Sequence, residues 1–236
     1  MAKRQKINSK VSVFDGILPP RFLGEVLESL ERVSKSSGLQ NLYQAGSCSK
    51  SFWYPLDRRP TNVYERLVRH LHKAAGIPKS CIGGEWWFNI RPANTAMQGH
   101  FDKDESVLKV KGEFVHPVRS SVYYLTDRGV PTMIYNVPSW ELLGYLKDEK
   151  RPFETCSIPP KKNRYAIFDG SLFHGAAYVE NSFTKLELDP NQPRIVLAVN
   201  WWKKKPAEPY CVDYDPSWGE EFYSVAKNLT GRNHGY

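Results

Sequence analysis

Hydrophobic positions recur with two different periods along the chain, and the change between them falls near residue 85. In residues 20–33 apolar side chains repeat about every 3.6 residues with glutamates between them, and the stretch "SKSSG" ends the pattern. In residues 60–76 the same pattern follows "PTN", a typical helix start, and stops at Gly76. These segments predict two amphipathic helices in the first 80 residues.

From residue 85 onward, short aromatic and β-branched runs are separated by Pro, Gly and Asn, which is typical of an antiparallel sandwich or barrel. Residues 137–154 suggest a short helix within this region. The expected strands are 85–91, 98–102, 119–126, 131–136, 154–158, 164–169, 174–179 and 194–202. We expect one domain, with residues 1–80 as a helical support, 85–202 as the β core and 203–236 as a C-terminal extension.

The expected strand 194–202 has two unlike faces. One face is wholly apolar and consists of Ile195, Leu197, Val199 and Trp201, whereas the other carries Arg194 and Asn200 among apolar residues. The stretch "WWFNIR" shows the same division, with Asn89 and Arg91 on the second face. A polar face opposite a buried one is what the wall of a polar cavity in a barrel requires. The alternative is an amphipathic sheet with this face in solvent.

Three residues form a candidate metal site. His100 and Asp102 are two apart in an extended segment, so both side chains project to the same side. This short pattern is weak alone, but His174 follows downstream in "AIFDGSLFHGA". Two imidazoles and one carboxylate suit non-haem Fe(II), and a zinc hydrolase uses similar ligands. Arg194 favours the first interpretation, since a guanidinium in a pocket is suited to bind a carboxylate.

Taken in order, the motifs "IRPAN", "HFD", "RSSVYYLTD", "IFDGSLFHGA" and "PRIVLAVNWW" resemble the 2-oxoglutarate- and Fe(II)-dependent oxygenases, in particular the prolyl-hydroxylase-like branch. The resemblance implies a mainly β fold with supporting α-helices, a double-stranded β-helix of the jelly-roll, cupin-like kind. It also implies that residues 1–236 are a single oxygenase domain. The implied activity is the hydroxylation of a C–H bond with Fe(II), O2 and 2-oxoglutarate as cosubstrate, and with release of succinate and CO2.

The resemblance also assigns roles to residues. His100, Asp102 and His174 would be the iron ligands, Arg194 would bind the distal carboxylate of 2-oxoglutarate, and Tyr124 would hydrogen-bond it. Arg91 stands where the branch often has a tyrosine, and we expect it to contact the substrate. Lys185 is a rival partner of the carboxylate, because some prolyl hydroxylases use a lysine about ten residues after the distal histidine.

Several functions remain open at this stage. The net charge of +8 and Lys203 to Lys205 indicate either a solvated basic face or an anionic partner. A nucleic-acid dealkylase of the same superfamily is disfavoured, because that branch has a second arginine where this chain has Asn200. A barrel that binds without turnover is a further alternative. A peptidyl residue, an amino acid and a small metabolite all fit as substrates, and the oligomeric state is left open.

The remaining features concern location. The chain has no apolar stretch of the roughly eighteen residues that a membrane span requires, and no signal-peptide pattern at its start. Its four cysteines are scattered and form no disulfide framework: Cys48, Cys81, Cys156 and Cys211. We therefore expect a cytoplasmic protein with reduced cysteines and no membrane partner.

Overall fold

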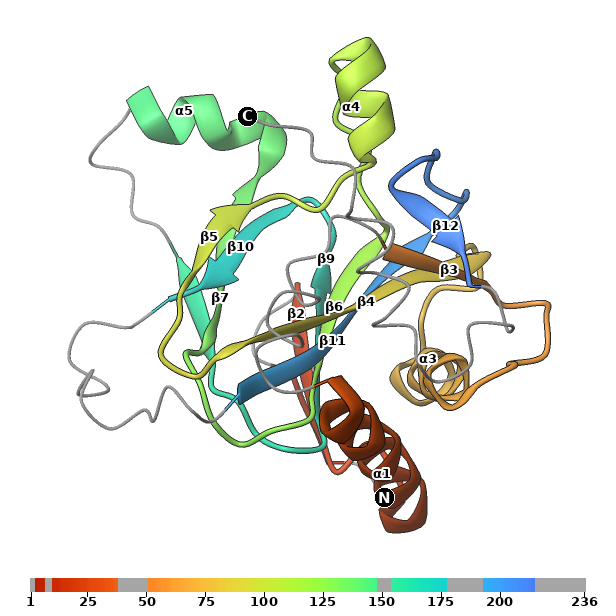
Figure 1. Cartoon of the computed structure of the whole chain (residues 1–236). Helices are drawn as coiled ribbons and strands as arrows, with labels where there is room; N and C mark the ends of the chain where they lie inside the picture. Colours follow the sequence, from red (N-terminus) through yellow and green to blue (C-terminus); the bar gives the residue numbers. More distant parts are fainter. Residues whose placement is uncertain (1–2, 7–9, 38–50, 148–153, 178–192, 215–236) are drawn as a thin grey trace.

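Two β-sheets face each other in the computed structural model, which describes residues 3–6, 10–37, 51–147, 154–177 and 193–214 (Figure 1). Apolar side chains from both sheets fill the space between them, among them Val13, Ile134, Phe168 and Val196. The fold is therefore the predicted β sandwich with supporting helices.

The larger sheet has the strand order β1-β2-β9-β6-β11-β4-β3-β12. Its strands are β1 (Lys3–Lys6), β2 (Val11–Asp15), β3 (Ser51–Pro55), β4 (Gly83–Pro92), β6 (Arg119–Tyr124), β9 (Arg164–Asp169), β11 (Pro193–Trp202) and β12 (Cys211–Asp213). The smaller sheet has the order β5-β10-β7-β8. Its strands are β5 (Met97–His100), β7 (Thr132–Pro138), β8 (Thr155–Ile158) and β10 (Leu172–Ala176). All pairs are antiparallel except β12 with β3, and the two facing sheets form the jelly roll that the resemblance implied.

Two helices cover the outer face of the larger sheet (Figure 1). Helix α1 (Pro20–Ser37) and helix α3 (Val63–Ala75) are the two amphipathic helices that the sequence predicted. Their apolar residues, such as Val26, Leu67 and Leu71, belong to one buried cluster with Leu197 and Trp201 of β11. Shorter helices are α4 (Glu105–Lys111), the 3-10 turn η1 (Ser139–Glu141) and α5 (Leu142–Lys147). Among the described residues, no helix is long and apolar enough to cross a bilayer.

The two faces of β11 are used as predicted. Leu197, Val199 and Trp201 pack under the helices, whereas Val196 belongs to the cluster between the sheets. Asn200, on the face of Val196, lines a cavity, and so does Trp87 from the neighbouring strand β4. The interpretation of this face as a cavity wall is confirmed.

The sequence pattern missed four strands. β1, β2 and β3 lie in the segment predicted to be a helical support, and β12 lies in the predicted C-terminal extension. Each of them widens the larger sheet rather than standing outside the β core. β2 pairs with β9 about 150 residues away, from Val11 opposite Phe168 to Asp15 opposite Arg164. No local turn signals such a pairing, and the strands are short.

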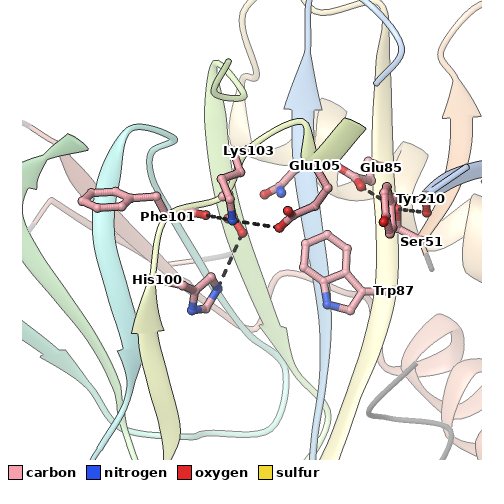
Figure 2. A pocket seen from close by; sticks show the side chains of 10 residues that line it. Ser51, Glu85, Trp87, His100, Phe101, Lys103, Glu105 and Tyr210 are labelled. Carbon is pink, nitrogen blue, oxygen red and sulfur yellow. Dashed lines mark hydrogen bonds and ion pairs between the residues drawn. The ribbon is translucent and has the colours of Figure 1, made fainter. Parts of the chain in front are cut away.

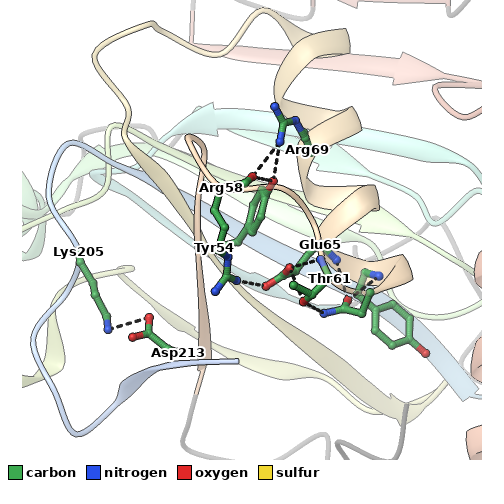
Figure 3. A network of polar contacts seen from close by, with 9 residues as sticks. Tyr54, Arg58, Thr61, Glu65, Arg69, Lys205 and Asp213 are labelled. Atoms are coloured by element: carbon green, nitrogen blue, oxygen red, sulfur yellow. Dashed lines mark hydrogen bonds and ion pairs between the residues drawn. The ribbon is translucent and has the colours of Figure 1, made fainter. Parts of the chain in front are cut away.

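A buried carboxylate joins the start of α3 to the chain that precedes it (Figure 3). The Glu65 side chain is 0% exposed and accepts hydrogen bonds from the Thr61 backbone nitrogen at 2.8 Å and the Thr61 hydroxyl at 2.9 Å. It also pairs with the Arg58 guanidinium. Asn62 caps the same helix end by accepting from two backbone N–H groups. Glu65 thus fixes α3, which supports β4 and β11 from outside.

We predict that Glu65→Gln lowers the free energy of unfolding by about 2 kcal/mol, because an uncharged amide leaves Arg58 without its anion and places an N–H group among donors. Urea denaturation measures the change. The matched control is Glu25→Gln on the exposed pair with Arg66, which should cost less than about 1 kcal/mol. Equal losses in the two variants would contradict a special role for Glu65.

Candidate functional site

The three predicted metal ligands come together between the sheets. His100 ends β5 and lies directly opposite His174 of β10, while Asp102 follows two residues after His100. The Asp102 carboxylate oxygens lie 3.7 Å from His100 Nε2 and 3.4 Å from His174 Nε2. One ligand atom from each residue falls within 4.8 Å of the others. Two imidazole nitrogens and one carboxylate oxygen are thus close enough to bind one metal ion, a ligand set that suits non-haem Fe(II).

Backbone contacts set the tautomer of both histidines. His100 Nδ1 lies 3.0 Å from the Gln98 carbonyl oxygen, and His174 Nδ1 lies 2.9 Å from the Leu172 carbonyl oxygen. A carbonyl only accepts, so each Nδ1 carries the hydrogen and donates it. Each Nε2 is then left with its lone pair directed at the shared centre. This is the orientation that a metal-binding imidazole needs, and the fold supplies it without the metal.

The protonation states also fit a metal. Burial lowers the pKa of His174, and His100 lowers it further, against an opposing effect of Asp102. Burial alone would raise the pKa of Asp102, but His174, His100, Ser120 and Asn200 together bring it below its ordinary value. A neutral imidazole at His174 and an ionised carboxylate at Asp102 are the forms that coordinate Fe(II).

Three residues around Asp102 were not predicted as site residues. His116 Nδ1 lies 2.6 Å from the Asp102 carbonyl oxygen, and its Nε2 lies 2.6 Å from the Ser139 hydroxyl. Ser120 and Asn200 sit opposite each other on β6 and β11, buried beside the Asp102 side chain. Ser120 and Asn200 are polar residues in otherwise apolar strands, and this feature of the sequence could have indicated them as site residues. His116 lies in a segment without a clear pattern.

Close backbone approach explains one glycine of the site. A Cβ atom at Gly99, between Gln98 and His100, would lie 2.2 Å from Cζ of the Phe173 ring. The Phe173 ring also packs against Phe101 with their centroids 5.1 Å apart. Glycine at position 99 therefore lets β5 lie against β10 with the two histidines in register.

Arg194 is buried at the start of β11 without an anion. Its side chain is 3% exposed, Nε donates to the Val130 carbonyl oxygen at 3.1 Å and Nη2 donates to the Thr132 hydroxyl at 3.0 Å. Within the described part of the chain, no carboxylate lies within ion-pair distance of it. Gly129, with φ +120°, permits the approach of its loop, since a Cβ there would lie 2.7 Å from Arg194 Cδ. A buried, unpaired guanidinium is costly unless an anion from outside joins it.

The spacing between Arg194 and the metal ligands suits a short dicarboxylate. On β7, Thr132 lies opposite Ala176 and Ile134 lies opposite His174. Two residues along a strand span about 7 Å, which is close to the length of a five-carbon dicarboxylate. The Thr132 hydroxyl accepts from Arg194 and from Tyr124, at 2.7 Å, and so keeps its own O–H to donate to a bound carboxylate. Thr132 was not predicted.

The other predicted residues lie around this end of the site. The Tyr124 ring lies under the Arg194 guanidinium at 5.7 Å, and its hydroxyl contacts Thr132 and the Ile158 carbonyl oxygen. Arg91 lies opposite Arg194 in the β4–β11 register, and its Nε donates to Asn89 Oδ1 at 3.2 Å. Arg91 does not line the cavity beside the metal ligands that is described next. Lys185, the rival of Arg194, lies outside the described residues.

A cavity of about 200 Å³ opens beside His100 and Asp102, at the Asn200 end of β11 (Figure 2). Its walls come from β3, β4, β11, the start of α4 and the segment before β12. The lining residues beyond the two metal ligands are Ser51, Glu85, Trp87, Phe101, Lys103, Glu105, Asn200 and Tyr210. The site therefore has two compartments, one by Arg194 and one by Glu85, with the metal ligands between them.

Comparisons with known proteins reveal distant structural likenesses. No family model and no curated protein matches the chain. A prolyl-4-hydroxylase from Pseudomonas putida is similar over 82% of this chain and 87% of its own, with 12% identity and a TM-score of 0.49. HygX from Streptomyces hygroscopicus, solved with nickel and 2-oxoglutarate, is similar over 82% of this chain and 81% of its own, with 14% identity and a TM-score of 0.46. The α-ketoglutarate-dependent epimerase SnoN is similar over 82% of this chain and 78% of its own, with the same identity and TM-score. At such distances the function has to be inferred from the side chains of the site.

We predict that His174→Ala weakens Fe(II) binding by at least about 100-fold, because it removes a ligand that the backbone has oriented. Anaerobic calorimetric titration with Fe(II) measures the affinity. The matched control is His70→Ala on α3, whose ring contacts the Ile17 carbonyl oxygen far from the three ligands, and it should bind normally. Fe(II) binding to His174→Ala with the wild-type affinity would contradict the assignment of His174 as a metal ligand.

Proposed function

We propose that this chain is an Fe(II)- and 2-oxoglutarate-dependent oxygenase that hydroxylates a C–H bond of a peptidyl residue, an amino acid or a small metabolite. The observation that supports it most is the combination of the His100–Asp102–His174 set with a buried Arg194 that no described carboxylate pairs. The partner of Arg194, Thr132, lies two residues along β7 from Ile134, which is opposite His174. A zinc hydrolase accounts for the three ligands but gives Arg194 nothing to bind. A dicarboxylate cosubstrate that reaches from the metal to Arg194 accounts for both.

The residues of the site would have the following roles. His100, Asp102 and His174 hold Fe(II) on one face, while Arg194 and Thr132 bind the far carboxylate of 2-oxoglutarate and orient its keto-acid end toward the metal. Tyr124 supports Thr132 and packs under the guanidinium. Bound iron with 2-oxoglutarate supplies the activation of O2, with succinate and CO2 as products alongside the oxidised substrate. The apolar cluster around Ile134, Phe168 and Val196 keeps bulk water from this compartment.

Two alternatives are distinguished by the same assay. A nucleic-acid dealkylase would oxidise a methylated oligonucleotide, and in this chain the residue at the position of the second arginine is Asn200, which lies buried beside Asp102. A non-catalytic barrel would bind Fe(II) and 2-oxoglutarate without forming succinate. Incubation of the iron-loaded protein with 2-oxoglutarate and O2, with succinate as the readout, tests the proposal. Metal and cosubstrate binding without any succinate, with and without candidate substrates, would favour the non-catalytic barrel.

We predict that Arg194→Ala raises the apparent KM for 2-oxoglutarate by roughly 30-fold, since the loss of a buried charge-assisted pair costs about 2 kcal/mol. Slow succinate formation without substrate measures this effect directly.

The control for this prediction is Arg91→Ala. As an expected substrate contact, Arg91 should leave the KM for 2-oxoglutarate and the uncoupled rate near their wild-type values. If Lys185→Ala shows the 30-fold effect while Arg194→Ala does not, Lys185 binds the carboxylate. If Arg91→Ala shows it, Arg91 belongs to the cosubstrate and not to the substrate.

A further inference from the structure

The cavity beside His100 and Asp102 has two further carboxyl groups, those of Glu85 and Glu105, in its wall (Figure 2). Glu85 reaches it from β4, Glu105 from the first turn of α4 and Asn200 from β11. Phe101 is packed against Phe114 and Phe173, so Trp87 is the aromatic wall that faces the cavity most freely. Tyr210 also lines it, but Lys109 Nζ already lies 4.8 Å from the centre of its ring.

Asn200 carries an acceptor that no described residue uses. The residue is 3% exposed, and its Oδ1 is buried with no hydrogen-bond partner among the described residues. A buried amide oxygen without a partner is costly, and a donor from a bound molecule would satisfy it.

Negative charge exceeds positive charge around this cavity. The one lysine that lines it is Lys103, whose Nζ lies 2.7 Å from Glu105 Oε1 and 3.5 Å from the Phe101 carbonyl oxygen. Lys103 thus neutralises Glu105, and within the described residues no cation lies within ion-pair distance of Glu85. An ammonium group placed here would meet a carboxyl group, an amide oxygen and the face of an indole ring.

Glu85 is held in place by neutral donors. Ser51 Oγ donates to its Oε1, and Trp202 Nε1 donates to its Oε2 at 2.9 Å. Burial raises the pKa of Glu85 to about 7 and outweighs the hydrogen bonds from Ser51 and Trp202, which lower it, while Asp102 and Asp104 raise it further. A cation beside Glu85 would favour its ionised form. If Glu85 only tied β3 and β11 to β4, its replacement would change stability without changing ligand preference.

We propose that this cavity is the substrate subsite of the enzyme and that it receives a primary ammonium group, which Glu85, Glu105 and Asn200 bind beside Trp87. The identification of this cavity as a substrate subsite rests on the proposed function. The binding of an ammonium group in it does not depend on turnover. With a volume of about 200 Å³, the cavity is smaller than the roughly 300–1,000 Å³ of drug-sized pockets and suits one side chain. The carbon chain that carries the ammonium group then extends toward His100 and Asp102.

The test compares a cation with a near-isosteric neutral probe. Protein loaded with Fe(II) and 2-oxoglutarate without O2, and metal-free protein in parallel, is titrated calorimetrically with N-acetyl-lysine methylamide, N-acetyl-norleucine methylamide and N-acetyl-glutamate methylamide. We expect the lysine probe to bind at least about 10-fold more tightly than the norleucine probe, and the glutamate probe to bind most weakly. Titration with 1,5-diaminopentane and free lysine then separates a peptidyl source of the ammonium group from a free amine.

Three variants test the wall of the cavity. Glu105→Gln is the main one, because its side chain is 44% exposed and its replacement should not disturb folding. It should reduce the preference for lysine over norleucine by several-fold. Glu85→Gln should do the same, provided that its thermal unfolding shows it to be folded. Lys103→Met should have the opposite effect on affinity. It removes the competing cation from Glu105, so the lysine probe should bind more tightly. Glu113→Gln on the exposed segment after α4 is the matched control and should change nothing.

Equal affinity for the lysine and norleucine probes, preference for the glutamate probe, or no binding of any probe would overturn the ammonium subsite. Normal binding of Fe(II) and 2-oxoglutarate in that same experiment would leave the proposed function intact. Conversely, if the protein binds neither Fe(II) nor 2-oxoglutarate but the metal-free form still prefers the lysine probe, the proposed function fails and the ammonium site stands.

Discussion

Strand β11 lies between β4 and β6 in the larger sheet, and it is buried on both faces. Its outer face packs under α1 and α3, and its inner face looks across at the smaller sheet. A strand in this position tolerates polar side chains only where something binds them. Arg194 and Asn200 are the polar residues on its inner face. Because the strand leaves both partly unsatisfied, the two ends of β11 define the two compartments of the site.

The metal ligands show how much of a site the backbone alone can prepare. Both histidines donate through Nδ1 to a carbonyl oxygen two residues earlier, and the pairing of β5 with β10 places them side by side. Asp102 follows β5 and is held through its own carbonyl oxygen by His116. Strand register and local hydrogen bonds thus orient all three ligands before any ion binds. The cost of ordering them is met by folding, so it does not weaken the binding of the metal.

The sequence predicted the parts of this protein that repeat regularly or follow a local motif. The alternation of residues 194–202 identified both faces of β11, and the spacing of His100 and Asp102 identified a shared side. It did not predict β2 and β3, since their partners are far along the chain and no turn links them. Nor did it predict Glu85, Thr132, Ser120 or His116. The role of a single polar residue in a strand depends on its neighbours in the tertiary fold. Local periodicity in the sequence does not indicate which residues those neighbours are.

The two compartments differ in the sign of their charge, and this difference determines which kind of ligand each of them favours. Arg194 and Asn200 are six residues apart on one face of β11, roughly 20 Å along the strand. In the proposed arrangement a dicarboxylate would be drawn to the guanidinium end and repelled by an ionised Glu85 at the other end, whereas a cation would experience the reverse. The three candidate metal ligands lie between, where an Fe(II) ion held by one carboxylate would keep a net positive charge. Such a centre would attract the keto-acid end of an anion and hold a cationic group at a distance, so that an uncharged carbon of the cation's chain, and not its ammonium group, would face the metal.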